Sequence, residues 1–135
     1  MPLITWGPKY ETGLSVIDVQ HRGLVDLINK LNDALEGDRG ADAMAGVFDD
    51  LLQYVHIHFR DEENLMTVHE YDDFPEHSRQ HDIFTSQMEM YRESFQDGSK
   101  VVSADLLEYL RSWLLTHITS TDRGYIGLFK EVGIK

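Results

Sequence analysis

Four stretches of the sequence repeat apolar residues at intervals of three and four, which places side chains on one face of an α-helix. They cover about residues 15–36, 41–69, 75–96 and 104–118, and the short segments between them contain glycine, proline or acidic residues. Helices of this length with short connections favour an antiparallel up-down-up-down four-helix bundle. We therefore expect an all-α fold with an N-terminal arm over about 1–14, the bundle over about 15–122, and a tail over about 123–135 whose pattern is compatible with a short C-terminal helix.

Each of the four apolar faces also carries histidine, and one carries a glutamate. In an up-down bundle, the starts of the first and third helices lie at the same end as the ends of the second and fourth, so these polar side chains should meet inside the bundle. A buried polar group without a partner costs about 1–3 kcal/mol, and a buried charge costs more. We expect a metal centre to supply the partner. The six residues are His21, His58, Glu62, His77, His81 and His117.

Other polar residues near the second face are expected to lie outside this centre. In the stretch HIHFRDEE, His56 precedes His58 by two residues, so it points about 200° away from His58 on a helix. His69 shares the stripe of Glu62 but lies about 10 Å further along the axis, where we expect it to interact with the helix dipole. Glu63 is expected on the solvated face.

The composition limits the classes of function. The chain has no cysteine, so a metal centre must use nitrogen and oxygen ligands. A formal net charge of -12 opposes binding to nucleic acid and to anionic membrane surfaces. The N-terminus lacks the pattern of a signal peptide, and no apolar run approaches the roughly 18 residues of a membrane span. We expect a single domain over 1–135 that is cytoplasmic, monomeric, and neither inserted in membranes nor bound to nucleic acid.

Two metal ions with five neutral imidazoles would need a second carboxylate for charge balance. Asp122 follows His117 by five residues in HITSTD, which is about 140° away from the histidine on a regular helix. Spacing alone does not select Asp122 over Asp105 or Glu108. We expect a local irregularity of the helix near residues 120–124.

The ordered set IDVQH (17–21), HFRDEE (58–63), HSRQH (77–81) and HITSTD (117–122) resembles the hemerythrin family in its single-domain bacterial form, bacteriohemerythrin. The likeness covers about residues 6–122 and implies a hemerythrin-like domain with two iron ions. It implies that one iron is bound by His77, His81 and His117, that the other is bound by His21 and His58, and that Glu62 and Asp122 bridge them together with an oxo or hydroxo group. It also implies an O2 pocket walled by Phe59, Trp113, Leu114 and Ile118.

This resemblance implies reversible O2 binding at the iron with the open position, for oxygen transport, storage or delivery to oxygen-consuming enzymes, and no enzymatic activity. The small number of carboxylates also favours reversible O2 binding over O–O cleavage, and the Glu-x-x-His pairs of ferritin-like oxygenases are absent from the sequence. Three alternatives stay open: a ferroxidase or peroxidase that detoxifies iron or peroxide, an O2 or redox sensor, and a surface zinc site at His77 and His81.

Overall fold

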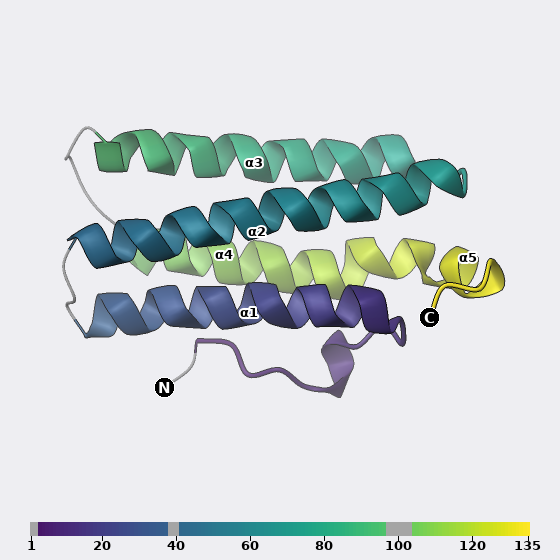
Figure 1. Cartoon of the computed structure of the whole chain (residues 1–135), viewed down its shortest axis with the longest axis horizontal. Helices are drawn as coiled ribbons and strands as arrows, with labels where there is room; N and C mark the ends of the chain where they lie inside the picture. The colour runs from purple at the N-terminus through teal and green to yellow at the C-terminus, as the bar shows by residue number, and fades with distance from the viewer. Residues whose placement is uncertain (1–2, 38–40, 97–103) are drawn as a thin grey trace.

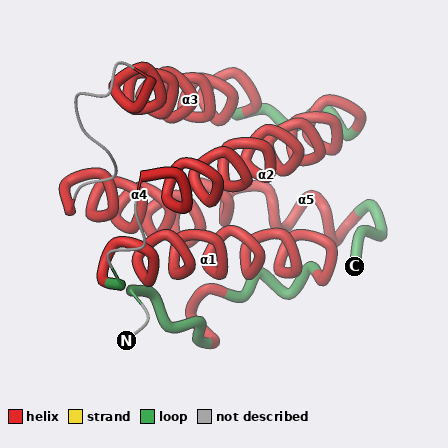
Figure 2. The backbone as a smooth tube through the Cα atoms, turned by 60° about the vertical axis from the view of Figure 1, so that its left-hand side comes forward, coloured by secondary structure: helices red, strands yellow, loops and turns green. Residues whose placement is uncertain are grey.

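The computed structural model describes residues 3–37, 41–96 and 104–135, and the fold in these ranges is a bundle of four long helices. The helices are α1 (Ser15–Glu36), α2 (Ala41–Val68), α3 (Phe74–Gln96) and α4 (Ala104–Thr116). Figure 1 shows that successive helices run in opposite directions and lie side by side, and Figure 2 shows the same arrangement from another side. The described residues contain no strand. The expected all-α up-down-up-down bundle is confirmed.

The apolar stripes of the four helices form the main core. Burying a leucine, isoleucine or phenylalanine side chain contributes about 1.5–3 kcal/mol, so this shared interior is the chief stabilising element of the bundle. The core fills the half of the bundle that contains the end of α1 and the start of α2. Its members include Leu24, Ile28, Leu31, Phe48, Leu51, Val55, Phe84, Met88, Leu106, Leu110 and Leu114, all of them buried.

The N-terminal arm is fixed to α1 by specific hydrogen bonds. The backbone N–H of Ile4 donates to Asn29 Oδ1 at 2.9 Å, and Asn29 Nδ2 donates to the carbonyl of Ile4 at 2.8 Å. Asp18 Oδ1 accepts from both the backbone N–H and the hydroxyl of Thr12 at 2.8 Å. Gly13 has a φ of +85°, a conformation that favours glycine, so the chain can turn there into α1.

The last part of α4 departs from regular α-helix. A π-helical turn covers His117–Thr121, a 3-10 turn covers Asp122–Tyr125, and a short helix α5 (Ile126–Glu131) follows. The expected irregularity near residues 120–124 and the short C-terminal helix are both confirmed. Figure 1 shows α5 at the end of the bundle, beside the start of α1.

A second, smaller core closes the bundle end at α5. Its buried residues are Leu14, Ile17, Met66, Tyr125 and Phe129, each with at most 1 % of its surface exposed. The backbone N–H of Val16 also donates to the carbonyl of Lys135 at 3.4 Å, which links the C-terminal segment to the first turn of α1. The chain therefore has two hydrophobic clusters with a layer of polar side chains between them. No helix in the described ranges has the length and apolar character needed to cross a membrane.

Candidate metal centre

The polar layer between the two cores consists of the histidines and the glutamate singled out from the sequence. The convergence expected from an up-down bundle is present, because all six side chains are buried with at most 2 % of their surface exposed. They come from α1, α2, α3 and the π-helical turn after α4. The six are His21, His58, Glu62, His77, His81 and His117.

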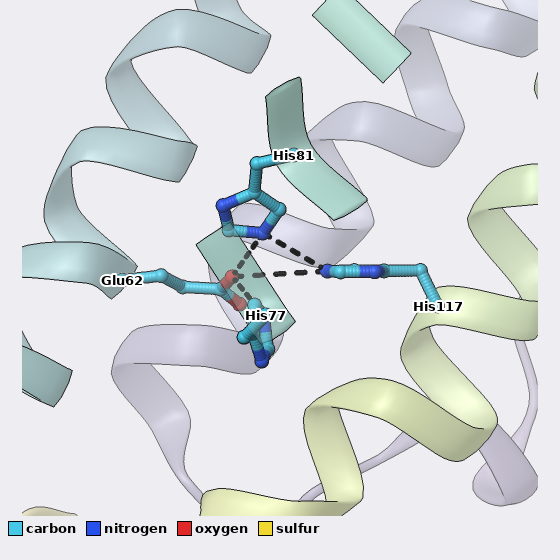
Figure 3. A group of neighbouring side chains, drawn as sticks. All are labelled: Glu62, His77, His81 and His117. Atoms are coloured by element: carbon cyan, nitrogen blue, oxygen red, sulfur yellow. Dashed lines mark hydrogen bonds and ion pairs between the residues drawn. The ribbon is translucent and has the colours of Figure 1, made fainter. Parts of the chain in front are cut away.

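Three imidazoles surround one oxygen of the Glu62 carboxylate. The Nε2 atoms of His77, His81 and His117 lie 3.4, 3.2 and 4.0 Å from Glu62 Oε1. Figure 3 shows these side chains pointing toward one another from separate parts of the bundle. His81 Nε2 also lies 3.1 Å from His117 Nε2. Two imidazole lone pairs at that distance repel each other, so either a proton or a cation between them is needed to stabilise the arrangement.

Two further imidazoles face the other oxygen of the same carboxylate. His21 Nε2 lies 3.5 Å and His58 Nε2 lies 3.2 Å from Glu62 Oε2. The candidate ligand atoms thus form two groups, one of three histidines and one of two, and Glu62 belongs to both. A carboxylate that presents one oxygen to each group can bridge two metal ions.

Hydrogen bonds behind the imidazoles fix their orientation. His58 Nδ1 lies 2.6 Å from Gln20 Oε1, and the amide of Gln20 in turn donates to Asp61 Oδ2 at 2.9 Å. An amide oxygen only accepts, so Nδ1 of His58 carries the proton and Nε2 keeps its lone pair toward the centre. Such a bond to the second ring nitrogen is typical of metal-binding histidine. Neither Gln20 nor this contact was expected from the sequence.

Glu63 was expected on the solvated face, and its side chain is partly exposed, but it also contacts the candidate centre, which was not expected. Its Oε2 lies 3.1 Å from His81 Nδ1, and its Oε1 accepts a hydrogen bond from Ser78 Oγ at 2.9 Å. The Glu63 side chain is 28 % exposed and lines a groove of about 500 Å³ that also reaches His81 and Phe59. The glutamate side chain is long enough to reach from α2 to the neighbouring α3, which helical spacing along α2 does not reveal.

Tyr125 is a second residue that sequence reasoning missed. Its hydroxyl donates to Glu62 Oε2 at 2.7 Å, and its side chain is fully buried. The two histidines expected outside the centre do lie outside it. His56 is exposed, as predicted. His69 follows the end of α2, and its ring packs edge-on against Phe129 with centroids 6.2 Å apart; its interaction with the helix dipole stays a prediction.

The carboxylate of Glu62 is held in its ionised form. Burial by itself raises the pKa of Glu62, but electrostatic interaction with His58 and hydrogen-bonding contacts with His117, His21 and His58 outweigh burial and hold the pKa well below its usual range. Every ion pair that Glu62 makes with the described residues is to histidine. Glu62 Oε1 and His58 Nε2 are fully buried and have no hydrogen-bond partner among those residues. Metal cations coordinated by these atoms would supply the missing positive charge, so the donor set fits a metal centre.

Asp122, the remaining predicted ligand, begins the 3-10 turn after the π-helical turn. A π-helical turn pairs residues five apart, so it brings the backbone five residues after His117 back toward the face of that histidine. Its side chain lies outside the described part of the structure.

A small apolar cavity lies one helical turn from the ligand layer. Its volume is about 10 Å³, close to the space that a single water molecule needs. Phe59, Trp113 and Leu114 line it, and Ile118 is buried in the same core. The lining also includes Leu24, Ile28, Leu51, Val55, Phe84 and Leu110.

Aromatic rings separate this cavity from the histidines. Phe59 stacks on His81 with centroids 3.7 Å apart and an interplanar angle of 3°. Trp113 stacks on His117 with centroids 4.4 Å apart. His81 and His117 therefore meet an apolar, aromatic wall on the side of the main core.

The fold and the polar layer together define a helical-bundle protein with a buried cluster of histidine and carboxylate side chains that could hold metal ions. Residues 12–129 match the family model described as the hemerythrin HHE cation binding domain. The bacteriohemerythrin of Pseudomonas aeruginosa is 37 % identical over 126 residues, which cover 93 % of this chain and 81 % of that protein. The bacteriohemerythrin of Methylococcus capsulatus is 33 % identical over 127 residues, which cover 93 % of this chain and 95 % of that one.

Solved structures agree with these relatives. A crystal structure of a leucine-to-alanine variant of hemerythrin superimposes with a TM-score of 0.88 at 31 % identity, and the match covers 95 % of this chain and 98 % of that chain. The chain belongs to the hemerythrin family.

Proposed function

We propose that this protein binds O2 reversibly at a centre of two iron ions and does not turn it over. His77, His81 and His117 would hold one iron, His21 and His58 would hold the other, and Glu62 and Asp122 would bridge them together with an oxo or hydroxo group. Iron in such a centre would supply the electrons for reversible O2 binding. Transport, storage or delivery of O2 to an oxygen-consuming enzyme is the role we propose for the protein.

This proposal rests on the way in which the two oxygens of the Glu62 carboxylate face different sets of histidines. One oxygen faces three imidazoles and the other faces two, with each of these five Nε2 atoms within 4.0 Å of its carboxylate oxygen. Unequal histidine sets give the two positions unequal numbers of protein ligands. The position with two histidines is then the one that keeps room for O2.

The apolar cavity supports reversible binding over oxidation chemistry. It is lined by hydrophobic and aromatic side chains, with no acid or base among them. Release of a charged oxygen species into such surroundings is costly, because an ion loses its hydration there. O2 itself is uncharged and can enter and leave. Our proposed walls of the O2 pocket are Phe59, Trp113 and Leu114, which line this cavity, and Ile118, which is buried in the same core.

The test is iron content together with the visible spectrum of the anaerobically reduced protein before and after exposure to air. We expect about two iron ions per chain, and an absorption band that appears with O2 and disappears under argon over several cycles. Immediate conversion to a stable ferric form with release of peroxide would overturn the proposal and indicate an enzyme of the detoxifying type. A protein that retains zinc and no iron would also overturn it.

A further inference from the structure

Tyr125 contacts the candidate centre from the C-terminal segment, outside the four long helices. Its hydroxyl donates to Glu62 Oε2 at 2.7 Å. Its ring stacks on His77 with centroids 5.6 Å apart and on Phe129 with centroids 4.4 Å apart. The ring is thus packed against two aromatic neighbours while the hydroxyl donates to a Glu62 oxygen.

The hydrogen bond reaches only one of the two carboxylate oxygens. Oε2 is the oxygen that faces His21 and His58, whereas Oε1 faces the group of three histidines. A hydrogen bond donated to an anionic oxygen withdraws electron density from it, so the oxygen becomes a weaker donor to a cation. The two oxygens of Glu62 are therefore not equivalent as donors to a cation, because Oε2 accepts the hydrogen bond from Tyr125.

We propose that Tyr125 is a positioning residue that holds Glu62 between the two metal positions and weakens its donation toward the position of His21 and His58. The inference rests on the metal centre of the proposed function. Weakening an anionic donor destabilises ferric iron more than ferrous iron, because the more highly charged ion gains more from a strong donor. Tyr125 thereby favours the reduced form at the position proposed to bind O2.

The decisive variant is Tyr125→Phe, which removes the hydroxyl and keeps the ring between His77 and Phe129. The iron-loaded protein is titrated anaerobically with redox mediators while its visible spectrum is followed. We expect the ratio of ferric to ferrous iron at a fixed solution potential to rise about three- to tenfold in the variant. A purely structural role for Tyr125 would change thermal stability and leave this ratio unaltered.

Tyr71→Phe is the matched control. Tyr71 packs edge-on against Tyr125 with centroids 6.3 Å apart, and its hydroxyl lies against Gly124. This control removes a phenolic hydroxyl from the same aromatic group without touching the Glu62 contact, and it should keep the wild-type ratio.

The outcomes separate this inference from the proposed function. An unchanged ratio in Tyr125→Phe, or an equal shift in Tyr71→Phe, would overturn the inference even if the wild type binds O2 reversibly. A shifted ratio confined to Tyr125→Phe would support it even if O2 binding proved irreversible. Loss of iron from folded Tyr125→Phe alone would also support positioning, and loss from both variants would overturn it. A wild type that loads no iron overturns both proposals.

Discussion

His58 and His56 lie two residues apart on α2, and replacing each by alanine tests the assignment of the centre most directly. His58 is 1 % exposed, with Nε2 3.2 Å from Glu62 Oε2 and Nδ1 2.6 Å from Gln20 Oε1. His56 is exposed. The two substitutions remove the same side chain from the same helix, so a difference between them reports position alone.

The expected loss of stability follows from these contacts. His58→Ala leaves the half-buried Gln20 oxygen without its donor, at about 1–3 kcal/mol, and leaves a space the size of an imidazole beside Glu62. We expect the metal-free variant to lose about 2–4 kcal/mol, which lowers the melting temperature by about 10 °C in a domain of this size. His56→Ala should stay within about 0.5 kcal/mol of wild type, as exposed positions usually do.

The assays are iron per chain after reconstitution and urea unfolding followed by circular dichroism. His58→Ala should retain one iron or fewer, whereas His56→Ala should retain the wild-type content. Equal loss of iron in the two variants would refute the assignment of faces on α2. A loss of stability in His58→Ala with the wild-type iron content would show that His58 is only a core residue.

Three further results are expected. Glu63→Gln should lower metal affinity about 10- to 100-fold, because the amide is a weaker acceptor for His81 Nδ1 than the carboxylate is. Competition with a chelator measures the affinity, and an unchanged value would leave Glu63 a surface residue. Leu114→Asn should speed autoxidation of the O2-bound protein by making the pocket wall polar, and an unaltered rate would remove Leu114 from that wall. Phe129→Ala should cost about 3–5 kcal/mol in urea unfolding, since it opens a cavity beside Tyr125; a loss under 1 kcal/mol would contradict the role of the second core.

The sequence predicts those parts of the structure that regular helices determine. The bounds of α1, the exposure of His56 and the meeting of His21, His58 and Glu62 with the other histidines all follow from a constant rotation per residue and from antiparallel topology. Both rules act over many residues, so errors of one or two positions at a helix end do not disturb them.

The residues that sequence reasoning missed depend on irregular or cross-helix geometry. Tyr125 ends the 3-10 turn that follows the π-helical turn, so no constant rotation per residue relates it to the ligands on the regular helices. Glu63 stands about 100° from Glu62 on α2, and only the position of α3 brings His81 within its reach. Gln20 pairs with His58 across two helices in the same way. No spacing within one helix reports such a contact.

The unequal size of the two hydrophobic clusters has a consequence for motion. Proteins open locally in cooperative units, and a unit with few buried apolar contacts opens at a lower free energy than the whole domain. The cluster at α5 has five buried residues, whereas the main core extends along all four long helices. The candidate ligands lie at the boundary between these units. A fluctuation that releases α5 alone therefore reaches the ligand layer while the bundle stays folded, and amide hydrogens of residues 126–131 should exchange sooner than those of residues 24–31.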